Sequence, residues 1–287
     1  MKNFDLEKVT AIIVLYNVND TIFHCLKNLE NIKIIIADNG RNDSKIIDKI
    51  INNKNIIKYF KFKKNIGFGR ACNFCQKYVN TEFTLFIEPD VYMDEENIVN
   101  LIRGFNKYPT SAVMIPTLIN TKKIITDELS NLPELNAKDK SSSSKKSFFE
   151  GDLCVNFNIA AVMLFKNSII TEYGLFNKKI FLYFEDYYMC RWYKMNKIPI
   201  IKLYNSRAIH DYKKGSSKRN LLTSCIVEKH FMKSTFIYSG INKNEFFFKK
   251  RLLLYFFRSI SYLLIFNIKN SLKNFSRVLA IIEYIRK

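Results

Sequence analysis

Residues 9–40 read VTAIIVLYNVNDTIFHCLKNLENIKIIIADNG, a stretch in which two strand-like runs enclose a helical one. Val9–Leu15 and Lys33–Ala37 are rich in β-branched residues and have the length of strands. Residues 21–29 between them have a helical pattern. A strand, a helix and a second strand in this order form a unit whose two strands run parallel. The first 40 residues therefore predict an α/β protein.

The same alternation continues along the next 50 residues. Residues 56–62 are expected to form a strand, residues 70–79 a helix, and residues 83–87 (FTLFI) a buried strand. Polar residues follow two of these strands, with Asp38 and Asn39 after one and Glu88 and Asp90 after the other. Because ligands of open α/β sheets bind at the carboxyl ends of the strands, these side chains are candidates for a site.

The pattern changes after Pro116. Residues 136–147 (NAKDKSSSSKKS) are polar and of low complexity, so a mobile surface loop is expected there. Order is expected again from residue 148, with an apolar run at 159–165 and helices at 166–173 and 185–195. From residue 242 the chain is basic, aromatic and expected to be helical.

Charge and hydropathy restrict the partners and the location. Lys and Arg number 46 against 26 Asp and Glu, a formal charge of +20 that favours anionic partners without choosing among them. The amino-terminal sequence MKNFDLEKVT lacks the pattern of a secretory signal, so a cytoplasmic location is expected. Residues 252–268 are the most apolar stretch, but Arg258 and Asn267 interrupt a run that is short for a membrane span.

The cysteines do not indicate a metal site. Of the six, only Cys72 and Cys75 have the C-x-x-C spacing, and a zinc site needs a second such pair or nearby histidines. The three histidines lie far from this pair in the sequence. We expect Cys72 and Cys75 to be buried thiols on a helix.

Four motifs resemble those of family 2 glycosyltransferases, and they are closest to the bacterial rhamnosyltransferase branch. They are IVLYN (13–17), DNGRND (38–43), the complete nine-residue signature NIGFGRACN (65–73), and EPD (88–90). A fifth stretch, FEDYYMCR (184–191), is similar to the family's E-D-x-D-L-C-x-R segment. The resemblance covers roughly residues 8–235. Four positions depart from the family's pattern, namely Arg41, Glu88, Ala160 and Tyr188.

The resemblance implies a three-layer α/β/α sandwich of the GT-A type, which is Rossmann-like, with a mostly parallel central sheet. Residues 1–241 would form the glycosyltransferase domain. Within it, residues 1–118 would be the nucleotide-sugar-binding half, 119–150 a variable mobile loop, and 151–241 the acceptor half with the catalytic base. Residues 242–287 would form a basic amphipathic helical tail.

The family's motifs also imply a binding site for the nucleotide-sugar donor. Gly67 and Gly69 permit close approach of the backbone, and the helix that follows offers unpaired N–H groups to phosphate. The residues implied in donor binding are Tyr16, Asn17, Asp38, Asn39, Asn65, Gly67, Gly69, Asn73 and Glu88.

A divalent cation, Mg²⁺ or Mn²⁺, is the implied cofactor. Glu88-Pro89-Asp90 resembles the branch's N-P-D version of the family's metal motif, and Asp90 is the implied ligand. Glu88 either adds a second carboxylate or hydrogen-bonds the ribose. His210 lies in a stretch similar to the family's H-x-x-x-x-S segment and is implied as a further ligand, with Ser216 or nearby lysines touching the diphosphate.

Asp186 matches the position of the family's general base, and Glu185 is the next candidate. Inverting transfer needs one carboxylate that takes the proton of the acceptor hydroxyl as it attacks. The expected reaction moves a sugar, rhamnose being the candidate, from a nucleotide diphosphate to a glycan or lipid-linked saccharide in cell-surface polysaccharide or lipooligosaccharide synthesis. The enzyme would be peripheral at the inner face of the cytoplasmic membrane.

The sequence allows several partners for the tail and several competing functions. The tail is expected to dock on an anionic membrane surface, or else to pack on the domain or form a homodimer. A nucleotidyltransferase would open with a glycine-rich loop, and residues 15–19 (LYNVN) contain no glycine. A nucleic-acid-binding protein would suit the charge, but it would leave the carboxylates at the strand ends unexplained, so no nucleic acid is expected. The departures from the family's pattern leave a catalytically impaired paralogue as an alternative.

Overall fold

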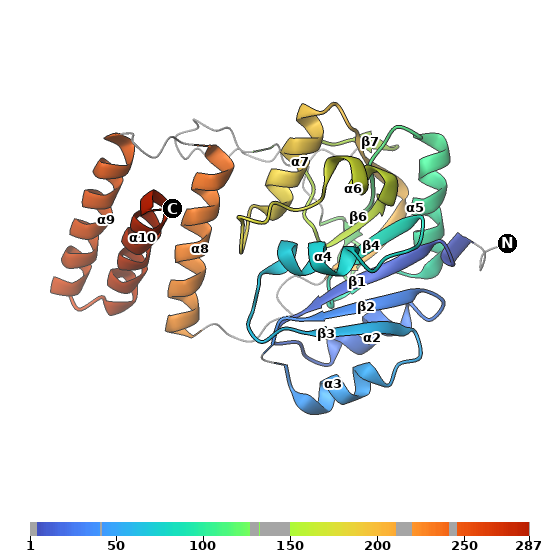
Figure 1. Ribbon diagram of the computed structural model, residues 1–287, viewed down its shortest axis with the longest axis horizontal. Helices are drawn as coiled ribbons and strands as arrows, with labels where there is room; N and C mark the ends of the chain where they lie inside the picture. Colours follow the sequence, from blue (N-terminus) through green and yellow to red (C-terminus); the bar gives the residue numbers. More distant parts are fainter. Residues whose placement is uncertain are drawn as a thin grey trace. The chain divides into compact units, whose positions relative to one another are not determined.

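The computed structural model describes residues 5–40, 42–126, 132, 150–210, 220–240 and 246–286 (Figure 1). The chain divides into two compact units. We call them the sheet unit (Met1–Pro133, Asp139–Asn177 and Asp186–Ser217) and the helical unit (Glu134–Lys138, Lys178–Glu185 and Lys218–Lys287). The loop expected at 136–147 lies outside the described residues.

One mixed sheet forms the centre of the sheet unit. Its strands lie in the order β3-β2-β1-β4-β8-β6-β9-β5, and β7 pairs with β9. The strands are β1 (Val9–Leu15), β2 (Lys33–Asp38), β3 (Ile56–Lys61), β4 (Phe83–Ile87), β5 (Val91–Tyr92), β6 (Val113–Ile119), β7 (Leu153–Cys154), β8 (Val162–Lys166) and β9 (Ile200–His210).

The four amino-terminal strands are parallel, as the sequence predicts. In this register Leu15 at the end of β1 lies beside Asp38 at the end of β2. The other half of the sheet is mixed, because β8 runs antiparallel to both β4 and β6 while β9 runs parallel to β6. The parallel half therefore brings the polar ends of β1, β2 and β4 to one edge of the sheet.

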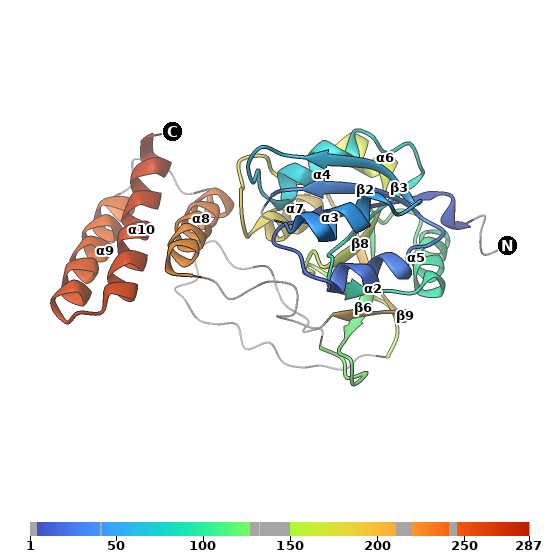
Figure 2. The same ribbon diagram turned by 90° about the horizontal axis from the view of Figure 1, so that it is seen from below.

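Helices cover both faces of the sheet, which confirms the three-layer α/β/α arrangement (Figure 2). Alternate residues of β1 point to opposite faces: Ile13 packs with one layer and Ile12 with the other. One layer contains α2 (Thr21–Lys27), α3 (Ser44–Ile51) and α5 (Glu95–Lys107), and the other contains α4 (Phe68–Gln76), α6 (Asn167–Tyr173) and α7 (Glu185–Met195).

The C-x-x-C cysteines belong to this packing. Cys72 and Cys75 lie on α4 and are fully buried in the second layer, as expected. Burial raises the pKa of Cys75 to about 12. In the described part of the chain, the metal-competent group of side chains lies elsewhere.

The helical unit consists mainly of α8 (Leu221–Ser239), α9 (Phe246–Leu264) and α10 (Ile268–Arg286). Its small core joins all three helices through Met232, Phe236, Phe248, Ala280 and Ile281. The expected boundary at residue 241 falls inside this unit, because α8 packs against α10 instead of ending the sheet unit. Over the described ranges, no helix is both long and apolar enough to cross a membrane.

Ion pairs also connect α10 to α8. The Glu283 carboxylate lies 2.8 Å from the Nζ atoms of both Lys229 and Lys233, and Arg277 lies 2.6 Å from Glu228. The hydrogen bonds from the two lysines lower the pKa of Glu283 to about 2. A boundary between residues 241 and 242 would therefore separate helices that are joined by both apolar contacts and charge.

Candidate active site

Asp38 organises the first part of the carboxyl edge of the sheet. This residue ends β2 and is only 2% exposed. One of its oxygens accepts hydrogen bonds from Gly40 N at 2.7 Å and from Asn42 Nδ2 at 2.5 Å, and the other accepts one from the Tyr59 hydroxyl at 2.5 Å. A carboxylate held by three hydrogen-bond donors has a fixed orientation.

Asn42 and Tyr59 are site-forming residues that the sequence analysis missed. Asn42 Oδ1 also accepts a hydrogen bond from Val18 N at 2.9 Å, so it joins the loop after β1 to the loop after β2. Burial, together with the hydrogen bond to Asp38 and its charge, raises the pKa of Tyr59. Asn42 lies within the motif DNGRND (38–43), which gave a signal for it. The only signal for Tyr59 was its strand, because the fold and not the sequence fixes the register of β3 against β2.

Tyr16 and Asn17 lie in the loop that follows β1. The Tyr16 side chain is 37% exposed, while the backbone of Asn17 has a φ of 56°. Asparagine tolerates this left-handed conformation better than most residues. The loop therefore turns sharply at Asn17 and leaves the Tyr16 ring accessible.

Two asparagines of the nine-residue signature, together with Asn39 of the motif DNGRND, hold backbone loops. Asn65 Oδ1 accepts a hydrogen bond from Gly67 N at 2.8 Å. Asn39 Oδ1 accepts one from Ile66 N at 3.3 Å, while its Nδ2 donates to Gly67 O at 3.4 Å. Asn73 binds both the N–H and the carbonyl of Phe176, at 3.1 and 2.7 Å.

Gly67 is where the signature requires a glycine. Its φ of 91° lies in the region that favours glycine, and it serves as the N-cap of α4 without a side-chain cap. The first backbone N–H groups of α4 follow directly, with Gly69 buried in the first turn. An α-helix of this kind leaves its first N–H groups without intrahelical partners, and these suit a phosphate.

Glu88, Asp90 and His210 form a cluster that is suited to a cation. The antiparallel pairing of β5 with β9 places Val91 opposite His210, so the residue just before β5 lies beside the histidine. His210 Nε2 lies 3.6 Å from Glu88 Oε2 and 3.9 Å from Asp90 Oδ1. One ligand atom of each residue falls within 4.8 Å of the others. The sequence named all three residues, and the structure brings them together.

Cys25 lies beneath this cluster but is not suited to be a ligand. Its thiol lies 3.8 Å from the carbonyl oxygen of Glu88. Burial, with a smaller contribution from the charge of Asp90, raises the pKa of Cys25 to about 12. Among the described residues, the group placed to hold a metal ion comprises Glu88, Asp90 and His210 without Cys25, so the donor set is two carboxylates and an imidazole.

Asp186 is joined to the same edge through two consecutive alanines. The Asp186 carboxylate accepts hydrogen bonds from the N–H of Tyr187, at 2.8 Å, and from that of Ala160. The carbonyl of the next residue, Ala161, accepts a hydrogen bond from Glu88 N at 2.9 Å. The expected base and the metal-competent cluster are therefore connected across the Ala160–Ala161 dipeptide.

Burial sets the acidity of Asp186. Desolvation raises its pKa to about 6, and the backbone hydrogen bonds offset part of this increase. The ring of Tyr187, the residue after Asp186, stacks on Phe157 with centroids 4.0 Å apart and planes 5° from parallel. Tyr188 is half-buried on the same helix, where the family's pattern has a second aspartate.

The remaining expected residues lie outside this cluster. Glu185 begins α7 and is grouped with the helical unit. Arg41, Ser216 and the lysines at 213 and 214 fall outside the described residues.

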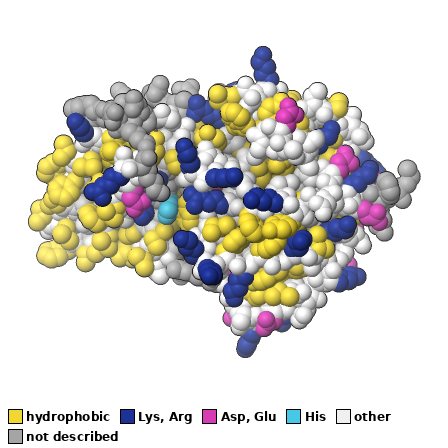
Figure 3. Space-filling view, viewed as in Figure 1, with side chains coloured by type: hydrophobic (Ala, Val, Ile, Leu, Met, Phe, Trp, Pro, Cys, Tyr) yellow, Lys and Arg dark blue, Asp and Glu magenta, His cyan; other side chains and the backbone are white. Residues whose placement is uncertain are grey.

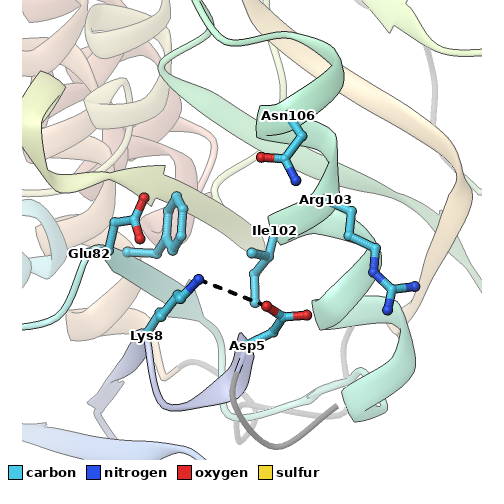
Figure 4. Close-up of a pocket in the computed structure, with 7 residues that line it drawn as sticks. Asp5, Lys8, Glu82, Ile102, Arg103 and Asn106 are labelled. Carbon is cyan, nitrogen blue, oxygen red and sulfur yellow. Dashed lines mark ion pairs between the residues drawn. The ribbon is translucent and has the colours of Figure 1, made fainter. Parts of the chain in front are cut away.

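A pocket of about 350 Å³ lies at the opposite edge of the sheet (Figure 4). The pocket lies near the beginnings of β1 and β4, and Lys8 and Phe83 are among the residues that line it. Lys8 Nζ lies 3.9 Å from the Asp5 carboxylate. None of the motif residues lines it. The carboxyl edge, not this pocket, carries the candidate chemistry.

Comparison with known proteins identifies the family and agrees with the fold. Residues 10–171 match the sequence profile of Glycosyl transferase family 2. No match was found among curated proteins.

Three solved structures are similar to the chain. The crystal structure of GalNAc-T7 with UDP, GalNAc and Mn²⁺ has a TM-score of 0.62 at 14% identity over 89% of this chain and 51% of that one. S. aureus TarS 1–349 in complex with UDP-GlcNAc has a TM-score of 0.55 at 13% identity, over 96% of this chain and 89% of that one. The mannosyltransferase PcManGT from Pyrobaculum calidifontis, in complex with GDP-Man and Mn²⁺, has a TM-score of 0.53 at 12% identity, over 96% and 73%. The chain thus spans about half the length of the GalNAc-T7 chain.

Proposed function

Since the chain belongs to Glycosyl transferase family 2, we propose that it transfers a sugar from a nucleotide diphosphate donor to an acceptor hydroxyl, with inversion at the anomeric carbon. The observation that carries the proposal is the connection across Ala160–Ala161. This dipeptide binds Asp186 on one side and the Glu88 backbone on the other, so a base and a cation-binding cluster occupy one edge of the sheet. In inverting transfer the base would take the proton of the acceptor hydroxyl, and a bound cation would neutralise the charge that develops on the leaving diphosphate.

The residues present fit a divalent cation. Glu88 and Asp90 offer carboxylate oxygens and His210 offers an imidazole nitrogen, all within 4.8 Å. Carboxylates suit both Mg²⁺ and Mn²⁺, whereas an imidazole ligand favours the transition metal. We therefore expect Mn²⁺ to support activity better than Mg²⁺. When bound, the cation neutralises charge on the departing nucleotide diphosphate.

Asp186 serves as the general base in this proposal. A carboxylate with a pKa of about 6 is mostly ionised at pH 7, yet it is more basic than an exposed aspartate. It would accept the proton of the acceptor hydroxyl while that oxygen attacks the anomeric carbon from the face opposite the leaving group.

The nucleotide-sugar-binding residues divide into two roles. Tyr16 and the first N–H groups of α4 after Gly67 would contact the donor directly. Asp38, Asn39, Asn65 and Asn73 would shape the loops, because their side chains are already bound to the backbone or to neighbouring side chains. Asn17 and Gly69 would provide the backbone conformation and the close packing that these loops need.

The proposal also includes the substrates and the location of the enzyme. The donor sugar would be rhamnose, and the acceptor a glycan or lipid-linked saccharide of cell-surface polysaccharide or lipooligosaccharide synthesis. The resemblance to the rhamnosyltransferase branch supports this choice. The enzyme would work at the inner face of the cytoplasmic membrane, with an anionic membrane surface as partner. Two alternatives are tested separately. A measurement of molecular mass would reveal a homodimer, and an activity assay would reveal a catalytically impaired paralogue.

A screen of nucleotide sugars tests the proposal. Thermal unfolding is measured with each donor, with and without Mn²⁺, and a matching donor should raise the Tm only when the ion is present. Release of the nucleoside diphosphate from that donor is then followed with candidate acceptors. Stabilisation by a single-stranded oligonucleotide in physiological salt, with none by any nucleotide sugar, would instead support a nucleic-acid-binding protein.

A further inference from the structure

The helix α9 carries an apolar face that its own unit does not cover. Seven large apolar side chains of this helix are exposed, among them Phe257 at 60% and Leu264 at 74%. The seven are Leu253, Leu254, Phe256, Phe257, Ile260, Leu263 and Leu264. Their spacing of three and four residues places them along one side of the helix. Figure 3 shows hydrophobic side chains gathered over α9 and α10.

The turn between α9 and α10 extends this face. Phe266 is 88% exposed, the highest value for a large apolar side chain in the described chain, and its φ is 55°. Ile265 and Ile268 beside it are also more than half exposed. A hairpin with an apolar tip of this kind is unusual on a protein surface that faces only water.

The opposite side of α9 already has its partner. Phe248 is buried against Phe236, and the Ser259 hydroxyl donates to the Ser271 carbonyl of α10 at 3.0 Å. The exposed face is therefore not the part of α9 that forms the core of the helical unit. It is a second apolar surface, opposite the first.

The charges around this face favour an anionic partner. From residue 246 to residue 282 the chain contains no Asp or Glu, while Lys and Arg occur repeatedly. Lys249 and Lys250 lie one turn before Leu253 on the same side of α9, and Lys269 follows the apolar turn. A surface of apolar side chains bordered by cations alone complements anionic lipid headgroups. In a pair of identical copies the same cations would face each other.

We propose that the exposed face of α9 and the 265–268 turn insert into the headgroup region of an anionic lipid bilayer, with Lys249 and Lys250 at the phosphates. The inference develops the membrane partner of the proposed function and rests on that part of it. The stretch from Leu253 to Leu264 is about 17 Å long, well short of the hydrocarbon thickness of about 30 Å, so it does not cross the bilayer. Insertion at this depth agrees with the finding that no described helix is suited to cross the membrane.

Vesicle flotation of the full-length protein tests the proposal. The vesicles contain phosphatidylcholine alone or phosphatidylcholine with phosphatidylglycerol. The variant Phe257→Ser/Leu264→Ser/Phe266→Ser should lower the fraction bound to anionic vesicles by at least about tenfold, because it removes three large apolar groups from the inserting surface. The matched control Ile57→Ser/Ile124→Ser/Met195→Ser changes three exposed apolar side chains of the sheet unit and should bind like the wild type.

A second pair of variants tests the charges. Lys249→Glu/Lys250→Glu should bind anionic vesicles less tightly, and wild-type binding should weaken as salt increases. The same double reversal at Lys45 and Lys54, exposed lysines of the sheet unit, should have little effect. This pair leaves the apolar face intact, so it remains informative if the serine variant does not fold.

Three results would overturn the proposal. The first is wild-type binding by either α9 variant, and the second is equal binding to neutral and anionic vesicles. The third is a wild-type dimer, shown by light scattering, that the serine variant converts to a monomer without any binding to vesicles. Mn²⁺-dependent stabilisation by the donor is measured on the same proteins. If the donor and Mn²⁺ do not stabilise the wild type, this counts against the proposed transferase. If they still stabilise a variant that no longer floats, this supports a docking surface that is separate from the donor site.

Discussion

Replacement of Asp186 by asparagine tests the proposed base. Asparagine keeps the shape of the side chain, and its Oδ1 can still accept the hydrogen bond from Tyr187 N, but the amide cannot take a proton. General-base catalysis typically contributes a factor of about 10² to 10⁴. We therefore expect kcat to fall by that factor while the affinity for the donor stays close to that of the wild type.

The pH dependence of kcat/KM gives a second, independent test of Asp186 as the base. Burial raises the pKa of Asp186 to about 6, and only the ionised form can act as a base. The wild-type kcat/KM should therefore be constant above about pH 7 and half its maximum near pH 6. At pH 5 it should be about one tenth of the maximum, because one pH unit is a tenfold change in ionisation.

The assay is release of the nucleoside diphosphate under saturating Mn²⁺, measured from pH 5 to pH 8. Asp94→Asn is the matched control, because Asp94 is exposed and its side chain caps α5 by accepting a hydrogen bond from Asn97 N, as an asparagine would. Glu185→Gln tests the neighbouring carboxylate. Near-wild-type turnover of Asp186→Asn would refute the reasoning, and a large loss in Glu185→Gln instead would move the base to that residue.

Three further predictions concern the cation, the nucleotide loops and the helical unit. Asp90→Ala should abolish transfer and remove the Mn²⁺-dependent part of nucleoside diphosphate binding measured by calorimetry; unchanged dependence on the ion would exclude this residue as a ligand. Tyr59→Phe removes one hydrogen bond to the buried carboxylate of Asp38, so we expect about 1.5–3 kcal/mol lower stability in urea and weaker nucleotide binding. A variant as stable as the wild type would show that this bond does not hold the loops. Glu283 has a folded-state pKa of about 2, below the value of 4.5 for a free glutamate, so its ion pairs stabilise the fold above about pH 4.5 and lose this effect as the pH falls towards 2. Glu283→Gln should therefore lower the Tm at pH 7, and the difference from the wild type should disappear near pH 2; a constant difference at all pH values would contradict the role of the ion pairs.

The sequence was most informative where a residue's role is local. The β-branched runs predicted β1 and β2 to within a residue, because a strand buried on both faces must be apolar throughout. The signature NIGFGRACN identified Gly67, whose positive φ only a glycine adopts readily. The separate motifs also named Glu88, Asp90 and His210 before any geometry was known.

Long-range contacts decided what these residues do. The antiparallel register of β5 and β9 places His210 beside Val91 although 119 positions separate them in the sequence. Asn73 illustrates the same point, since its amide is bound to the backbone of Phe176 and organises a distant loop. Sequence distance carries no information on such pairs, because a register depends on how the whole sheet assembles.

By itself, the sequence determined the class of fold, the candidate carboxylates and the basic, apolar character of the carboxyl-terminal helices. These features depend on hydrophobic periodicity, on residue type and on short spacing, which are local properties. Only the tertiary structure decided that Ala160 and Ala161 join Asp186 to the metal-competent cluster, and that α8 belongs with α9 and α10. Both connections depend on which elements pack together in the folded chain. Burial of apolar surface between distant segments determines those contacts, and no short stretch of sequence specifies them.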